Sequence, residues 1–300
     1  KALEAGGAVK LEGDIAAEGP LAIAAGTEVV LDLAGHTLSL AEGQSAASLI
    51  TVEPGAKLTV TDSTAAPLTS QCRAEEHGFP ASRAGELAVY DAGSHELTYY
   101  VTTTKTNRSS GTTSETRHKE QVNLGSAGAI EVAGLTAAVE VQDGAAFAMD
   151  GGRLTNAGGA HGVKAGNATV TITGNAAIAG SGSAGATGDD ANGAGIYQAD
   201  GALEVSGNAV IADNRAANSG GGIYVAAGSA TIAGNAVVAG NAASEGDAVG
   251  DKANEHAPSY DGGGIYVAKA AALTMEGEAV VSGNVARRDG GGIYVEPQPK

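Results

Sequence analysis

Apolar and polar residues alternate along the first part of the chain, in short runs separated by glycines. Ala8-Val9-Lys10-Leu11-Glu12 is the first such run, and the alternation recurs over Val29–Leu33, Thr37–Leu40, Leu49–Val52 and Leu58–Val60. A period of two residues is typical of β-strands, and glycines between the runs suit turns with positive φ. No segment keeps an apolar period near 3.6 for long enough to predict a helix. The pattern therefore predicts an all-β fold.

The second half of the chain carries a repeat. Gly-Gly-Gly-Ile-Tyr-Val occurs at Gly220–Val225, Gly262–Val267 and Gly290–Val295, and a degenerate copy lies at Gly193–Tyr197. The repeated tyrosines are spaced by 27, 42 and 28 residues, and the longest step contains a polar insert over 244–259. Two more short apolar runs lie between successive copies. Three strands per period of ~27 residues predict a triangular solenoid of about eight coils, with parallel strands stacked ~4.8 Å apart.

Asparagines recur at fixed places within the repeat. Stacking the repeats predicts two columns: Asn175, Asn208 and Asn235, with Glu278 in the next place, and Asn214, Asn241 and Asn284. A corner amide can bond its neighbours above and below and can satisfy backbone groups that a turn leaves unpaired. We therefore assign both columns a structural role and no chemistry.

The segment 66–125 interrupts the strand pattern. It holds six of the 17 Lys and Arg residues, three of the six His residues and the single cysteine, Cys72. Glu86–Tyr90 and Glu96–Thr103 predict a two-stranded hairpin, and a Ser/Thr-rich loop is expected over 102–116. About 60 residues of this polarity bury little core, so we expect a protruding hairpin insertion and not a separate domain.

One solenoid domain accounts for the rest of the chain. We place its N-terminal coils at 1–65 and its repeat coils at 126–295, on either side of the insertion. Residues 296–300, with the sequence Glu-Pro-Gln-Pro-Lys, predict the start of an extended linker. Together with the absence of a signal peptide at Lys1, this favours an internal piece of a longer, processed chain.

Composition narrows the possible partners. The formal net charge of −17 argues against a nucleic-acid groove and against an anionic membrane surface, since both need clustered Lys and Arg. No run reaches the ~18–20 apolar residues of a membrane span, so we expect no direct membrane insertion in this fragment. The single Cys72 excludes an intrachain disulfide and a cysteine-based metal site. No cofactor is implied.

The glycine-rich repeat resembles that of known surface proteins. Gly-Gly-Gly-Ile-Tyr-Val, followed by Ile/Val-x-Gly-Asn, is similar to repeats of bacterial polymorphic outer-membrane proteins and of Gram-positive surface proteins. The segments Val29–Leu38, Leu58–Ser63 and Leu97–Val101 also resemble parts of such proteins. The resemblance implies a right-handed parallel β-helix of the pectin-lyase-like type and a location at the bacterial cell surface or outside the cell. The fold hosts lyases, glycosidases, adhesins and inert stalks alike.

Two groups of tyrosines are candidate ligand contacts. Alternation turns Ile223 and Val225 inward and Tyr224 outward, which predicts an outward column of Tyr197, Tyr224, Tyr266 and Tyr294. The column is either a platform for a glycan or peptide or a self-supporting stack. On the hairpin, Tyr99 and Tyr100 could contact a ligand, or the hairpin could simply protect the side of the solenoid.

Enzymatic chemistry finds little support in the sequence. A glycosidase needs two carboxyl groups about 5–9.5 Å apart, yet the acids on or beside strands share no column: Glu131, Glu140, Glu204, Glu276 and Glu278. Asp213 and Asp261 lie in turns, where aspartate usually bonds its own backbone. Asp247, Asp251, Glu255 and His256 match no calcium motif, and the six histidines lack metal-ligand spacing.

These observations favour a non-catalytic module of a bacterial cell-surface protein, acting as an adhesin or a stalk. Its partner would be a host or microbial glycan or protein. The alternatives are a carbohydrate-active enzyme, either a polysaccharide lyase or a glycoside hydrolase, and a glycan-binding lectin that uses the tyrosine column.

Overall fold

The computed structural model describes residues 3, 6–68, 71–77, 88–106, 109–125, 128–182, 185–243 and 260–297, with the backbone alone for 71–77. The side chain of Cys72, the acids of the 244–259 insert and residues 298–300 of the expected linker lie outside this description.

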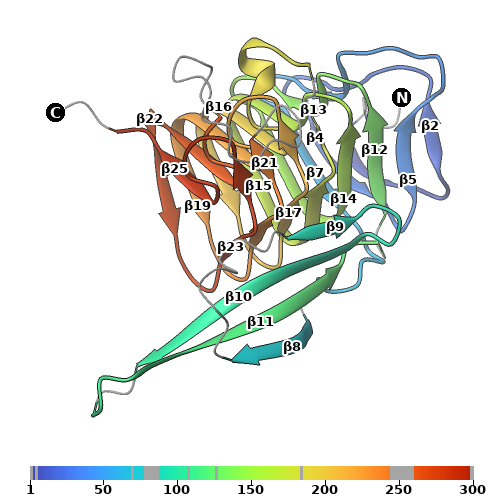
Figure 1. Ribbon diagram of the computed structural model, residues 1–300. Coiled ribbons are helices and arrows are strands. Elements are labelled where there is room, and N and C mark those ends of the chain that lie inside the picture. Colours follow the sequence, from blue (N-terminus) through green and yellow to red (C-terminus); the bar gives the residue numbers. More distant parts are fainter. Residues whose placement is uncertain are drawn as a thin grey trace.

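The described chain winds into the expected all-β, parallel β-helix solenoid, whose first and last coils lie at opposite ends (Figure 1). Three parallel faces of eight strands each form its wall, which confirms the predicted number of coils. Face A contains β1 (Gly7–Lys10), β4 (Glu28–Asp32), β7 (Lys57–Thr61) and parts of β14 (Ala146–Ala157), β15 (His161–Ala179), β16 (Ile196–Val205), β19 (Ile223–Ile232) and β22 (Ile265–Met275).

The other two faces share the long strands with face A, because those strands bend through the corners. Face B contains β2 (Ile15–Ala17), β5 (Thr37–Leu40), β12 (Ala129–Ala133), β17 (Val210–Ala212), β20 (Val237–Ala239), β23 (Val280–Ser282) and parts of β14 and β15. Face C contains β3 (Leu21–Ile23), β6 (Ser48–Val52), β13 (Ala137–Val141), β25 (Ile293–Val295) and parts of β15, β16, β19 and β22. Between faces B and C lie the short strands β18 (Arg215–Ala216), β21 (Ala242–Ala243) and β24 (Val285–Ala286). A short 3-10 turn, η3 (Gly188–Ala191), lies between β15 and β16.

The interior is a column of aliphatic side chains. Ile196, Ile223, Ile265 and Ile293 stack in register on face C, and the first three are completely buried. The glycines of the repeat let neighbouring coils approach. Gly220 has a φ of +67°, which favours glycine, and a Cβ at Gly221 would lie 2.4 Å from the carbonyl oxygen of Ala242.

The insertion leaves the wall between β7 and β12, and β12 resumes the stack directly on β5. It forms an antiparallel sheet in the order β8 (Gln71–His77), β11 (Thr113–Asn123), β10 (Glu96–Thr106) and β9 (Val89–Asp91). The predicted pairing of β9 with β10 is present. The Ser/Thr-rich loop expected over 102–116 is wrong, because most of it belongs to the long β10–β11 hairpin. Threonine is β-branched and favours strands, which is the physical reason for this difference.

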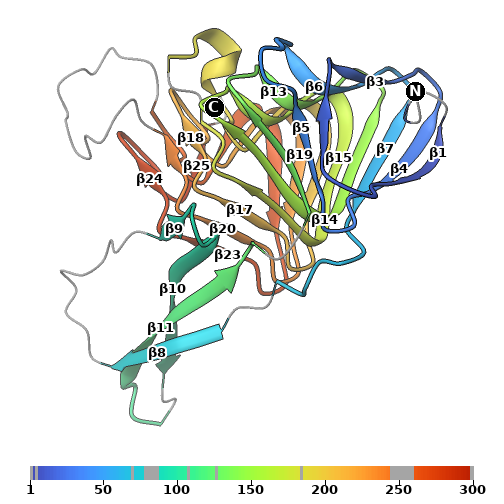
Figure 2. The ribbon, with the colours of Figure 1, turned by 90° about the vertical axis from the view of Figure 1, so that its right-hand side faces the viewer.

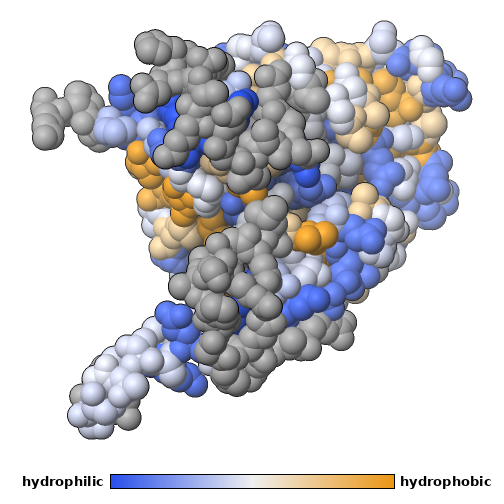
Figure 3. All heavy atoms as spheres, viewed as in Figure 1, coloured by the Kyte–Doolittle hydropathy of each residue, from blue (hydrophilic) through white to orange (hydrophobic). Residues whose placement is uncertain are grey.

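We refer to β9, β10 and β11 as the arm. Its base packs on the outer side of face B, alongside β20 and β23, while its far end projects beyond the solenoid (Figures 1 and 2). Leu97, Tyr99 and Val122 of the arm bury against small apolar residues of face B such as Ala212 and Val237. The projecting end, from Thr102 to Thr106, is exposed, and the surface there is white to blue with no hydrophobic patch in this view (Figure 3).

Candidate functional site

The four tyrosines of the repeat stack on one another along face C. Ring centroids lie 5.5 Å apart for Tyr197 and Tyr224, 4.8 Å for Tyr224 and Tyr266, and 5.3 Å for Tyr266 and Tyr294. The stack is less open than expected, since Tyr197 is 7% and Tyr266 3% exposed, whereas Tyr224 and Tyr294 are half-buried. Burial raises the pKa of Tyr197 to about 12, so its hydroxyl stays protonated. This geometry fits a self-supporting stack, and ligand binding by the column remains a prediction.

Polar groups contact the tyrosine stack at its first and third rings. The ring of His161 lies 5.5 Å from that of Tyr197 and is fully buried, with Nδ1 donating to the Gly193 carbonyl at 2.9 Å. Its Nε2 lies 3.3 Å from Asp190, which also accepts a hydrogen bond of 2.6 Å from Lys164. Burial lowers the pKa of His161. Further along the stack, the hydroxyl of Tyr266, the third of the four rings, donates to Glu296. These contacts fix the rings and leave them little freedom to open toward a ligand.

The inner asparagine column, Asn214, Asn241 and Asn284, forms a ladder at the corner between faces B and C. The Nδ2 of Asn214 donates to Oδ1 of Asn241 at 3.0 Å, and the Nδ2 of Asn241 donates to Oδ1 of Asn284 at 2.9 Å. The same amides also donate to the carbonyls of Ile178 and Ile211. Because Asn214 and Asn241 are fully buried, this column satisfies backbone groups that water cannot reach.

The outer asparagine column, Asn175, Asn208 and Asn235, lies at the corner between faces A and B. Asn208 donates to Asn175 at 3.3 Å, and Asn235 donates to Asn208 at 3.2 Å. The free end of the column is tied to the insertion, because Asn175 accepts a hydrogen bond of 2.9 Å from the backbone of Leu68. This column is partly exposed, so its amides can also reach solvent or a ligand.

The two arm tyrosines have different environments. Tyr99 is 2% exposed and packs between the arm and face B, so it is not displayed on the outer surface of the hairpin. Tyr100 is half-buried, and the guanidinium of Arg117 lies 3.8 Å from its ring centroid, a cation–π contact. The carbonyl of Tyr100 accepts a hydrogen bond of 2.6 Å from Ser282 on β23. Both tyrosines hold the arm in place, and ligand binding by either one stays a prediction.

A cleft lies where the arm meets coils of face B, and we refer to it as the polar cleft. It measures about 640 Å³. Glu131 of β12 and Arg153 of β14 form an ion pair on its floor, with the Arg153 residue only 5% exposed. Tyr90 and His95 of the arm share a hydrogen bond of 2.9 Å on the opposite side. Asp213 completes the polar lining.

Apolar side chains line the remainder of this cleft. Leu40, Val132 and Leu135 supply them, together with small alanines. A cleft that combines apolar wall with a few fixed polar groups is the usual composition of a small-molecule or sugar site. The volume also falls within the range that such sites occupy.

Burial shifts the titration of several groups in the polar cleft. It raises the pKa of Tyr90 and the pKa of Asp213, because the charged form of each loses hydration. It lowers the pKa of His95, and the nearby positive charge of Arg153 acts in the same direction. Near neutral pH, Tyr90 and His95 are therefore uncharged hydrogen-bonding groups, which suits recognition of hydroxyl groups.

The backbone is unusual at the same place. Three non-glycine residues of the described chain have positive φ, and two of them line the polar cleft: His95 at 55° and Asp213 at 50°. Aspartate and histidine tolerate this conformation better than most residues, yet it still costs free energy. Such backbone conformations concentrate at functional sites.

The sequence identified only part of this cleft. The sequence presents Glu131 and Asp213 as isolated acids and Tyr90 as one of the hairpin tyrosines, and it does not point to Arg153 or His95 as their partners. Arg153 could have been noticed, because a charged residue sits there within an apolar strand pattern, and the register places it diagonally to Glu131. The contribution of Tyr90 and His95 depends on where the arm docks, which the sequence does not indicate.

The other strand acids remain apart, as predicted from their positions. Glu131, Glu140 and Glu204 lie on faces B, C and A, respectively. In the described part of the chain, no three His, Cys, Asp or Glu side chains gather closely enough to hold a metal ion. The same residues include no helix long and apolar enough to span a membrane.

Comparison with protein families, with curated proteins and with solved structures found no match.

Proposed function

We propose that this chain is a rigid, non-catalytic binding module of a bacterial cell-surface protein, and that it binds a glycan in the polar cleft. The single observation that carries the proposal is this cleft, in which the buried Arg153, the Tyr90–His95 pair and Asp213 face an apolar wall. Groups mounted on a strand scaffold lose little conformational entropy on binding, so such a site is preorganised.

The surface location rests on the repeat. Gly-Gly-Gly-Ile-Tyr-Val and the asparagine places resemble repeats of bacterial surface proteins of the pectin-lyase-like, right-handed β-helix type. A stacked solenoid also suits a role as a spacer, because each coil contacts only its neighbours and the length grows with the number of repeats.

A glycan array with the whole chain tests the proposal. We expect saturable binding to a subset of glycans, reduced about tenfold or more in Tyr90→Phe, which removes one hydroxyl from the cleft. Tyr294→Phe is the matched control, because it removes a hydroxyl from the stack and leaves the cleft intact. Binding lost in Tyr294→Phe and kept in Tyr90→Phe would favour the tyrosine column instead, and no binding by the wild type would leave a spacer role.

A second candidate is a carbohydrate-active enzyme, and one observation favours it. Asp213, whose pKa is raised by burial, lines the same cleft as Glu131, which is ion-paired with Arg153. Glycosidases use one protonated and one ionised carboxyl group. Polyuronides and mucin glycans incubated with the protein would yield products, and Asp213→Asn would abolish their formation. Absence of products with a glycan that binds would support the non-catalytic role.

A further inference from the structure

A second cleft lies under the arm, toward the later coils of the solenoid. We refer to it as the valine cleft, because Val210, Val237 and Val280 stand in register on the outer side of face B and form its floor. Tyr99 and Val101 of β10 form its roof. The cleft measures about 470 Å³, which is within the range of small-molecule sites. Three strands ~4.8 Å apart make the valine row about 10 Å long.

The outer asparagine column borders this cleft, and Glu278 changes its chemistry. The backbone N–H groups of Asn208, Asn235 and Glu278 each donate to a glycine carbonyl of the preceding coil, so Glu278 occupies the asparagine place. Asn235 donates its amide to Asn208, and its exposed Oδ1 accepts no hydrogen bond from any other described residue. A carboxylate offers only acceptors. The carboxylate of Glu278 therefore meets Oδ1 of Asn235 as one acceptor beside another, whereas in the earlier coils an Asn amide donates to an Asn oxygen.

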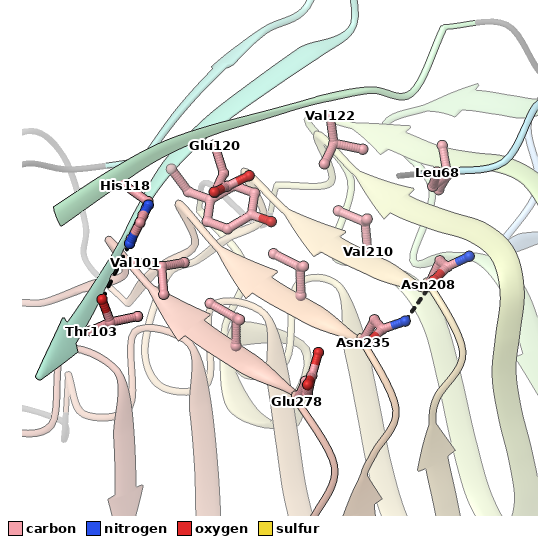
Figure 4. Close-up of a pocket in the computed structure, with 13 residues that line it drawn as sticks. Leu68, Val101, Thr103, His118, Glu120, Val122, Asn208, Val210, Asn235 and Glu278 are labelled. Carbon is pink, nitrogen blue, oxygen red and sulfur yellow. Dashed lines mark hydrogen bonds between the residues drawn. The ribbon is translucent and has the colours of Figure 1, made fainter. Parts of the chain in front are cut away.

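The opposite border carries a second carboxylate, that of Glu120 on β11. Figure 4 shows Glu120 on a strand of the arm and Glu278 at the corner of the solenoid, with the cleft between them. Within the described residues neither carboxylate has a hydrogen-bond or ion-pair partner, and no Lys or Arg lines the cleft. The remaining ionisable group, His118, bonds Thr103 at 3.2 Å. The cleft is therefore apolar along its floor and rich in acceptors at its borders.

We propose that the valine cleft binds a linear alkylamine, such as a free diamine or polyamine, with its methylene chain on Val210, Val237 and Val280 and its ammonium groups at Glu278 and Glu120. An ammonium group supplies three donors and a positive charge, which are what the Asn235 and Glu278 oxygens lack. The methylene chain removes apolar wall from water. The net charge of −17 also attracts cations to the protein as a whole. This site is independent of the polar cleft.

Calorimetric titration of the whole chain with 1,5-diaminopentane and with spermidine at low salt tests the proposal. We expect saturable binding that weakens as salt increases, because charged contacts at a partly open cleft are screened. Glu278→Gln should weaken it about tenfold or more, since a charge-assisted hydrogen bond is lost. Glu276→Gln, which removes the same charge just outside the cleft, should leave the affinity unchanged.

A further variant and a set of control ligands make the outcome decisive. Glu278→Asn restores the amide of the earlier coils, so it should keep or raise the melting temperature while losing amine binding, which separates binding from folding. The proposal is overturned if no saturation is seen up to about 10 mM diamine, or if 1,5-pentanediol binds equally well. It is also overturned if Glu276→Gln and Glu278→Gln weaken binding equally, or if a lysine-containing peptide binds and the free amines do not.

Discussion

The two asparagine columns use the same residue at the same spacing and yet differ in environment. In the inner column, Asn214 and Asn241 are fully buried, and their amides bond both each other and backbone carbonyls. In the outer column, Asn208 and Asn235 bond mainly along the column and remain partly exposed. The position of each asparagine column relative to the core therefore decides its role. A buried column only holds the coils together, whereas an exposed column can also contact a ligand.

The largest expected effect comes from cutting the inner column. Asn241→Ala removes the side-chain hydrogen bonds to the Ile211 carbonyl and to Oδ1 of Asn284, and it leaves the backbone N–H of the buried Asn214 without its acceptor. Each buried unsatisfied group costs about 1–3 kcal/mol, so we expect a loss of roughly 3–5 kcal/mol in the free energy of unfolding. Urea titration followed by circular dichroism measures it. A loss below about 1 kcal/mol would mean that water enters this corner and that the two columns are equivalent.

A smaller effect on the free energy of unfolding is expected at Asp213, the residue before Asn214, and there the substitution should stabilise the protein. Its pKa in the folded protein is raised by burial, so the folded state holds the proton more tightly than the unfolded chain and stability falls as pH rises above about 4. Asp213→Asn removes the buried charge and keeps a residue that tolerates positive φ. We expect the variant to be more stable than the wild type at pH 7, although it loses the 4.0 Å ion pair with Arg215, and equal to the wild type at pH 3.

Thermal unfolding at the two pH values checks this prediction. Asp200→Asn, on the exposed corner between faces C and A, is the control for removal of a surface charge. Equal stabilisation by both substitutions would indicate a general reduction of the net charge and not a local cost at the polar cleft.

The smallest effect is expected in the outer column. Asn235→Ala removes one exposed amide and its hydrogen bond to Asn208, so we expect a loss of about 0.5 kcal/mol or less. The same urea titration compares it directly with Asn241→Ala. A loss as large as that of Asn241→Ala would show that the outer ladder is as important to folding as the inner one.

The arm shows where prediction from the sequence stopped. Val210-Ile211-Ala212 and Val237-Val238-Ala239 of face B are apolar at every position, which is typical of strands buried on both sides. One side faces the solenoid interior, and the arm covers the other. The runs could have predicted a cover, but nothing in them identified β10 and β11 as that cover.

The repeat by itself determined the solenoid. Its period, its glycines and the alternation around Tyr224 fix three strands per coil, the inward isoleucines and the asparagine columns, because every coil meets only a near copy of itself. Only the tertiary structure decided the clefts. The arm lies across coils that come later in the chain, so it brings Tyr90 and His95 to Arg153, 63 and 58 residues further on, and Glu120 to Glu278, 158 residues further on. Contacts between a unique segment and a repeat have no period, and no local pattern encodes them.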